Sequence, residues 1–181
     1  MSHNKPVLLI GGPADGMRIT LSASARIFNS CARGLPDNED HAEATLGADD
    51  ANYDVPGSEI TTYAIGTVQG AFHEVFHVGT VDLNTCILCE LVAGYRKPKS
   101  HPTDPNVAKQ LVTLLGGAAD GRQIVLGSLA NFVPAGEMGD AYHVVPLICR
   151  DGTQVRVGVL DMMRVDPIRL LIEGYRMGAP A

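Results

Sequence analysis

Short apolar runs separated by turn residues recur along the chain, and this pattern predicts a protein built largely from short strands. Residues 7–10 and 19–21 are apolar runs on either side of the turn Gly-Gly-Pro-Ala-Asp-Gly. Residues 112–115 and 124–126 flank a second turn, Gly-Gly-Ala-Ala-Asp-Gly, in the same way. Glycine readily adopts the positive φ angles that a tight reversal needs. Each of these segments is therefore predicted to form a hairpin.

A second hairpin is predicted downstream in each half of the chain. It is expected over residues 142–160, where Asp151-Gly152 supplies the turn between two apolar runs. The corresponding hairpin of the first half is expected over residues 61–81.

One helix is predicted to close each half. Asp82 is expected to cap a helix over residues 83–93, since a carboxylate accepts from the first free amides of a helix. Asp166 and Pro167 are expected to begin a second helix, which ends with Gly174 in the left-handed capping conformation.

The two halves are related by sequence. Residues 7–22 and 112–127 align at an offset of 105 with nine identities in sixteen positions. Residues 91–96 (LVAGYR) and 171–176 (LIEGYR) align at an offset of 80, and the two matching blocks follow the same order. The sequence therefore indicates a tandem duplication. We expect an α+β fold with two copies of a small antiparallel sheet of about four strands, each closed by one helix, in a pseudo-two-fold arrangement.

The duplication also predicts the domain boundaries. The first repeat is expected at residues 1–98, a linker rich in proline at 99–110, and the second repeat at 111–181. The difference between the two offsets places an insertion in the first repeat at about residues 23–60. This segment is irregular and acidic, which favours a surface loop over a binding arm.

Composition and charge exclude several classes of function. The net charge of -6, with no basic stripe, argues against binding to nucleic acid or to an anionic membrane surface. No apolar run approaches the roughly 18 residues of a membrane span, and the N-terminus shows no secretory leader. We therefore expect a cytoplasmic protein with its four cysteines reduced.

The two glycine turns are candidate ligand sites. Their composition suggests a phosphate loop, but such a loop leads into a helix, whereas a strand is predicted here. A structural turn is the favoured interpretation. The alternative is a small-ligand site in a cleft between the repeats, formed by the turn residues Gly12, Asp15, Gly117 and Asp120.

The segment His73-Glu74-Val75-Phe76-His77 matches the H-E-x-x-H pattern of zinc hydrolases. In those enzymes a helix places the two histidines on one metal and the glutamate beside the bound water. A strand is predicted here, on which the histidines lie roughly 13 Å apart and Glu74 points to the other face. We therefore expect no metal and no cofactor; the alternative is a zinc site with ligands His73 and His77 and catalytic Glu74.

Two further local patterns have a structural and a functional interpretation. Cys86 and Cys89 have C-x-x-C spacing, but no second such pair follows, and their apolar neighbours favour burial in the core over a redox or zinc site. Tyr95-Arg96 and Tyr175-Arg176 follow the two helices and are expected to pack on the sheets, although a pair of binding spots is the alternative.

Residues 9–16 (LIGGPADG) give a resemblance to a known group of proteins. The segment resembles small uncharacterised proteins of tailed phages and prophages, which open with a Gly-Gly-Pro-x-Asp-Gly turn. The resemblance implies a phage-like origin and a small unit rich in β structure, without catalytic residues. We expect a non-enzymatic protein–protein interaction module, either a minor virion component or a host-directed inhibitor, that binds a protein partner or itself.

Overall fold

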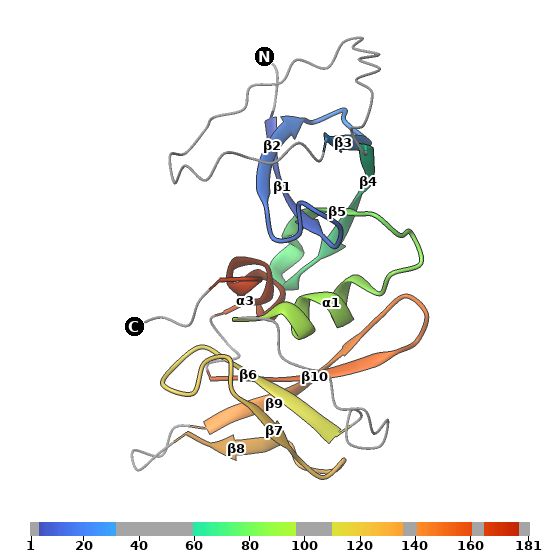
Figure 1. The fold of residues 1–181 in the computed structure, drawn as a ribbon. Coiled ribbons are helices and arrows are strands. Elements are labelled where there is room, and N and C mark those ends of the chain that lie inside the picture. Colours follow the sequence, from blue (N-terminus) through green and yellow to red (C-terminus); the bar gives the residue numbers. More distant parts are fainter. Residues whose placement is uncertain (1–3, 32–59, 97–109, 136–140, 161–164, 178–181) are drawn as a thin grey trace. The chain divides into compact units, whose positions relative to one another are not determined.

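Sheets dominate the structure. The computed structural model describes residues 4–31, 60–96, 110–135, 141–160 and 165–177 (Figure 1). Over these residues the chain forms two five-stranded sheets, two α-helices and one 3₁₀ turn. Most of the predicted acidic insertion and nearly all of the predicted linker lie outside the described residues. None of the described helices is long and apolar enough to cross a membrane.

The first sheet has the strand order β2-β1-β5-β4-β3. Its strands are β1 (Asn4–Ile10), β2 (Arg18–Ser22), β3 (Ile27–Cys31), β4 (Ile60–Gln69) and β5 (Val75–Thr80). β1 pairs antiparallel with β2 and parallel with β5, so the first strand lies inside the sheet. β3 pairs antiparallel with β4 and forms the other edge.

The second sheet repeats this topology with the order β7-β6-β10-β9-β8. Its strands are β6 (Leu111–Leu115), β7 (Gln123–Val125), β8 (Phe132–Pro134), β9 (Ala141–Ile148) and β10 (Gln154–Val159). β6 pairs parallel with β10 and antiparallel with β7. The same strand order in both sheets confirms the duplication of a sheet-rich unit.

Two details of the predicted sheets are wrong. Each sheet has five strands and not four, and each contains one parallel pair. The missed strands are β3, which begins inside the segment predicted to be an irregular insertion, and β8, which has only three residues and ends in proline. Such short strands are formed by pairing with a neighbour, and their own sequence pattern is too brief to predict them.

Equivalent residues fill the inner faces of the two sheets. The first cluster contains Val7, Leu9 and Tyr63, all at most 2% exposed, and the second contains Val112, Leu114 and Tyr142. In the parallel pairs Val7 lies opposite His77, and Val112 lies opposite Arg156. The two downstream hairpins are therefore equivalent at an offset of 79 residues.

The contacts between residues divide the chain into two compact units. The first comprises residues 1–66 and 77–83, and the second comprises residues 67–76 and 84–181. The tip of the β4–β5 hairpin, with the 3₁₀ turn η1 (Ala71–His73), thus belongs to the same unit as the second sheet and both helices.

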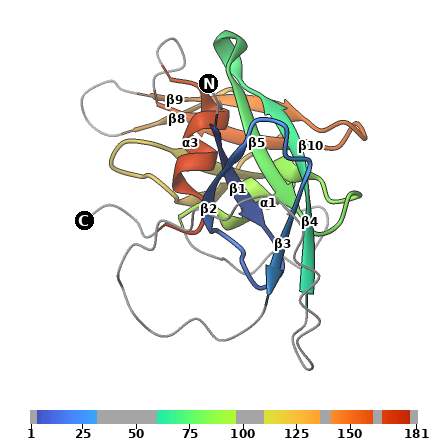
Figure 2. The same ribbon diagram turned by 90° about the horizontal axis from the view of Figure 1, so that it is seen from above.

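The helices α1 (Ile87–Gly94) and α3 (Pro167–Gly174) lie side by side in this second unit and contact β10 and β6 respectively (Figures 1 and 2). Asp166 caps α3 as predicted, because its carboxylate accepts from the Ile168 amide at 2.8 Å. The predicted cap of α1 by Asp82 is wrong. The helix begins four residues later than predicted, with Cys86 as N-cap, and Leu83 stays 81% exposed.

Each helix ends against a tyrosine that follows the other helix. A Cβ on Gly94 would overlap the Tyr175 ring, and a Cβ on Gly174 would overlap the Tyr95 ring. The positive φ angle after each helix is carried by the arginine of the Tyr-Arg pair, so the left-handed conformation predicted for Gly174 is wrong. Close approach of the ring, not backbone conformation, is what requires glycine here.

Candidate functional site

The first glycine turn is held by its own side chains. The Gly11 amide donates to the Asp15 carboxylate at 2.7 Å, which closes the turn locally. The Tyr63 hydroxyl, from β4, donates to the Gly11 carbonyl at 2.8 Å and accepts from the Ala14 amide at 2.9 Å. The Gly11 and Ala14 amides and the Gly11 carbonyl are therefore already hydrogen-bonded to side chains of the protein.

The second glycine turn has the same construction. The Gly116 amide donates to Asp120 at 2.7 Å. The Tyr142 hydroxyl, from β9, donates to the Gly116 carbonyl at 2.7 Å and accepts from the Ala119 amide at 3.1 Å. A tyrosine from the second hairpin thus fixes the turn of the first hairpin in both copies.

Steric constraints explain the second glycine of each turn. A Cβ on Gly12 would lie 2.7 Å from the Tyr63 hydroxyl, and a Cβ on Gly117 would lie 2.9 Å from the Tyr142 hydroxyl. The predicted positive φ angles at both glycines are confirmed. The structure places the four candidate ligand residues in these two turns, where they build the turns themselves: Gly12, Asp15, Gly117 and Asp120.

Asp120 also joins the second turn to the segment after α1. Its carboxylate accepts from the Tyr95 hydroxyl at 2.6 Å and from the Arg96 guanidinium at 2.7 Å. Burial, followed by the hydrogen bond to Asp120 and the charge of Asp120, raises the pKa of the Tyr95 phenol. The Arg96 guanidinium also lies over the Tyr95 ring, 5.3 Å from its centroid. The Tyr95-Arg96 pair therefore has a structural role at this place.

The H-E-x-x-H segment is not a helix, and only part of it is a strand. His73 ends the 3₁₀ turn with a φ of 62°, and His77 lies on β5. The prediction of two histidines along one strand is therefore wrong, because His73 lies in the turn that precedes β5. Glu74 forms an ion pair with Arg169 of α3, and a second hydrogen bond of 3.1 Å joins the same side chains.

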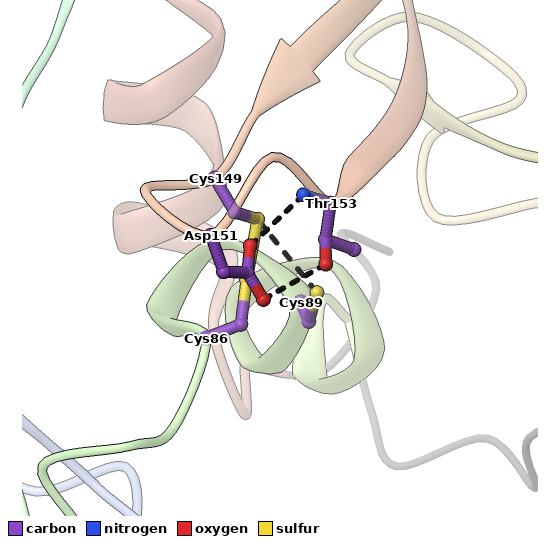
Figure 3. The surroundings of a disulfide bond; sticks show 5 residues. All are labelled: Cys86, Cys89, Cys149, Asp151 and Thr153. Atoms are coloured by element: carbon purple, nitrogen blue, oxygen red, sulfur yellow. Dashed lines mark hydrogen bonds between the residues drawn. A yellow bond between two sulfur atoms is a disulfide. The ribbon is translucent and has the colours of Figure 1, made fainter.

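Three cysteines meet where α1 approaches the turn between β9 and β10. A disulfide joins Cys86 to Cys149, which corrects the expectation that all cysteines are reduced. Cys89 is not disulfide-bonded, and its sulfur lies 3.8 Å from that of Cys149 (Figure 3). The side chain of Asp151 accepts two hydrogen bonds from Thr153, which hold the turn in shape. The three sulfurs lie within 4.8 Å of one another and form the one group of potential metal ligands among the described residues.

The equivalent hairpin-to-helix contact contains no cysteine. Gly70 is equivalent to Cys149 and Asp166 is equivalent to Cys86, by the offsets of the hairpins and helices. A Cβ on Gly70 would overlap the Asp166 carboxylate, so the hairpin tip approaches the N-terminus of α3 closely. Each of the two contacts therefore joins the hairpin of one copy to the helix of the other, with a capping carboxylate in one contact and a disulfide in the other.

A second pair of equivalent residues shows the same difference. Arg169 and Glu74 form the ion pair between α3 and the tip of the β4–β5 hairpin. Their equivalents are Cys89 and Thr153, which lie beside the disulfide (Figure 3). The charged pair of one hairpin-to-helix contact is therefore replaced by a thiol and a hydroxyl in the equivalent contact.

The surroundings of Cys89 are negatively charged. Burial, followed by the charges of Asp151 and Glu90, raises the pKa of the Cys89 thiol. Two hydrogen bonds from Thr153 lower the pKa of the exposed Asp151 carboxyl, which is therefore ionised at neutral pH. This potential disfavours a nucleophilic thiolate at Cys89 and favours a nearby cation.

No protein-family model matches the chain, and comparisons with curated proteins and with solved structures give no match either.

Sequence reasoning identified the C-x-x-C pair but missed Cys149. That residue is distant in sequence and lies next to the hairpin turn at Asp151-Gly152. The duplication aligns Cys86 with Asp166 and Cys149 with Gly70. The contact between Gly70 and Asp166 is seen only in the structure, so the sequence alone contains no signal that Cys86 and Cys149 meet.

Proposed function

We propose that this protein is a non-enzymatic protein–protein interaction module of phage or prophage type, acting as a minor virion component or as a host-directed inhibitor. We also propose that the fold is an α+β duplication whose two copies are related by a pseudo-two-fold axis. The resemblance of residues 9–16 to small proteins of tailed phages and prophages supports the phage or prophage origin. The interaction role is supported by the edges of the two sheets.

Both sheets expose a large apolar side chain at the same position of an edge strand. Ile27 begins β3 and is 60% exposed, and Phe132 begins β8 and is 65% exposed. The next residues, Phe28 and Val133, lie opposite the equivalent residues Tyr63 and Tyr142, so the two exposed positions correspond. This repeated exposure is the observation that carries the proposal.

An edge strand with an apolar side chain can bind a partner in two ways at once. Its outward backbone groups can pair with an extended segment, and its apolar side chain can enter a pocket of the partner. Aromatic residues such as Phe132 are enriched at protein interfaces. On the second sheet Leu129, in the loop before β8, is also 90% exposed and extends the apolar surface.

The glycine turns support a binding module over an enzyme. In each turn two amides and one carbonyl are engaged by an aspartate and a tyrosine, which are Asp15 and Tyr63 in one copy and Asp120 and Tyr142 in the other. The duplicated motif of the sequence thus stabilises the fold.

Affinity capture with variants tests the proposal. The bait is the full chain, captured from host lysate and from virions, with Ile27→Asp and Phe132→Asp as test variants. Val75→Asp is the matched control, because Val75 is also apolar and 55% exposed but lies on β5, inside the sheet. We expect one partner, or a second copy of the chain, to be lost with an edge variant and retained with the control.

Three results would contradict an interaction module. One is a monomer that enriches no partner, and another is equal capture by all variants. The third is hydrolysis that depends on one metal per chain and is lost in His73→Ala and His77→Ala, which would establish the zinc hydrolase. A small ligand that shifts thermal unfolding and protects a glycine turn would instead establish the ligand-binding alternative.

A further inference from the structure

The three-cysteine cluster has the dimensions of a metal site. Zinc–thiolate bonds of about 2.3 Å in tetrahedral geometry place two sulfurs about 3.8 Å apart. The sulfurs of Cys89 and Cys149 lie 3.8 Å apart, and all three sulfurs of the cluster lie within 4.8 Å of one another. Small displacements of the side chains are enough to place all three on one ion.

The elements that carry the cysteines suit metal binding. Cys86 is the N-cap of α1 and Cys89 lies in its first turn, so the C-x-x-C spacing places both cysteines at the same end of one helix. The third sulfur, of Cys149, comes from the reversal between β9 and β10, which the hydrogen bonds within that turn hold in place. The ligands therefore come from two ordered elements of one compact unit.

The equivalent contact, between the β4–β5 hairpin and α3, shows that sulfur is not required. There, Asp166 caps its helix through the Ile168 amide, and Glu74 pairs with Arg169. The same hairpin-to-helix contact is therefore made with ordinary polar groups. Three cysteines at the equivalent places are more than the contact needs, which points to a role in binding.

We propose that the reduced form of this protein binds one thiophilic metal ion, with zinc as the expected occupant, through Cys86, Cys89 and Cys149. Soft thiolate ligands favour zinc over calcium or magnesium. Three protein ligands leave a fourth position for water. The negative charges of Asp151 and Glu90 near Cys89 attract the cation.

Binding requires the disulfide to be opened first. A dithiol reductant supplies two electrons and two protons, becomes a disulfide itself, and leaves Cys86 and Cys149 as thiols. The metal ion then forms three metal–sulfur bonds, and three thiol protons are released to solvent. The oxidised chain, with two of its three ligands in a covalent bond, does not bind the ion.

Cobalt titration tests the site, because cobalt(II) is a spectroscopic substitute for zinc. The full chain is reduced anaerobically with a phosphine, whose oxidation to the phosphine oxide takes its oxygen from water and leaves the protons on the sulfurs. We expect one cobalt per chain, a sulfur-to-metal charge-transfer band, and displacement of cobalt by one equivalent of zinc. The air-oxidised chain is expected to show no band.

Variants make the assignment specific. Cys89→Ser is expected to lose the charge-transfer band or to weaken cobalt binding by at least about tenfold. Cys31→Ser is the matched control, because Cys31 lies on β3 of the first sheet, and should bind as the wild type does. Cys86→Asp combined with Cys149→Gly introduces the residues of the equivalent contact and should fold without binding metal.

Two outcomes would overturn the site. The first is a fully reduced, folded wild-type chain that binds no cobalt. The second is Cys89→Ser binding cobalt as tightly as wild type, which would place the metal elsewhere. Native mass spectrometry of the zinc form and circular dichroism of each variant separate loss of the site from loss of the fold.

Discussion

Gly70 and Cys149 are equivalent residues at the tips of the two duplicated hairpins. The amide of Gly70 donates to the Glu74 carbonyl at 2.9 Å, and the amide of Cys149 donates to the Thr153 carbonyl at 2.7 Å. Each tip approaches the N-cap of a helix, which is a carboxylate for Gly70 and a bonded cysteine for Cys149. Duplication has thus produced two versions of one contact.

The capping carboxylate should be transferable between the copies. Cys86→Asp with Cys149→Gly is expected to be more stable than Cys86→Ala with Cys149→Gly by about 0.5–2 kcal/mol, because only the aspartate can accept from the free amides of α1. Cys86 makes no such capping hydrogen bond. Urea denaturation of both variants under reducing conditions measures the difference. Equal stabilities would show that α1 gains nothing from a capping side chain.

The two adjacent glycines of each turn should differ in their tolerance of alanine. Gly11 has a φ of +78° but open space around a new Cβ, so Gly11→Ala is expected to cost about 1–2 kcal/mol through backbone strain alone. Gly12→Ala adds a Cβ 2.7 Å from the Tyr63 hydroxyl and 2.9 Å from Val81, and should cost distinctly more.

The second copy gives an independent repeat of this comparison. Gly116→Ala and Gly117→Ala are expected to show the same order, since their φ angles are +79° and +66° and only the second glycine faces a tyrosine hydroxyl. Thermal and urea denaturation of the four variants measure it. If Gly12→Ala cost no more than Gly11→Ala, the tyrosine would not restrain the turn.

The close contact of each helix end with a tyrosine ring predicts that alanine in place of the last glycine of either helix destabilises the protein. Gly94→Ala and Gly174→Ala each place a methyl group inside the ring of Tyr175 or Tyr95, and overpacking of this kind typically costs about 1–3 kcal/mol. Gly127→Ala is the control, because its Cβ meets nothing within 4 Å. Alanine is otherwise the better helix former, so a stabilising Gly94→Ala would contradict the contact.

Much of the local structure follows from the sequence. The glycine turns, the duplication and the Asp166 cap depend on residues that are adjacent or periodic, and these predictions are confirmed. The features that depend on residues distant in sequence could not be predicted. The start of α1 follows from packing in the second unit, not from Asp82, and β8 exists because β9 pairs with it.

The candidate sites show the same limit. The H-E-x-x-H segment matches the motif of zinc hydrolases, yet its two histidines lie in different elements. His73 ends a 3₁₀ turn, and His77 lies on β5. Cys149 joins Cys86 across 63 residues of sequence, and local spacing contains no sign of it. Cys86 and Cys149 are related to Asp166 and Gly70 only when equivalent positions of the two copies are compared in the structure.

His77 should make stability depend on pH. Its side chain lies on β5, and its Nδ1 atom is buried with no hydrogen-bond partner in the described part of the chain. Burial, followed by the positive charges of Lys5 and Arg26, lowers the pKa of His77 below its ordinary value of 6.5. Lys5 is itself held in place, because its ammonium donates to the carbonyls of Ala23 and Ala25.

The sign of this dependence follows from proton binding. Between the folded pKa of His77 and 6.5 the unfolded chain binds more protons, so the free energy of unfolding falls as the pH decreases through this window. Above 6.5 the histidine is neutral in both states and has no such effect.

His77→Gln, which cannot take up a proton, is expected to lose stability less steeply than wild type between about pH 8 and about pH 5. Urea denaturation across this range measures the two slopes, with His143→Gln, at an exposed position of β9, controlling for the loss of a histidine as such. Parallel curves for wild type and His77→Gln would show that neither burial nor the charges of Lys5 and Arg26 lower the pKa of this side chain.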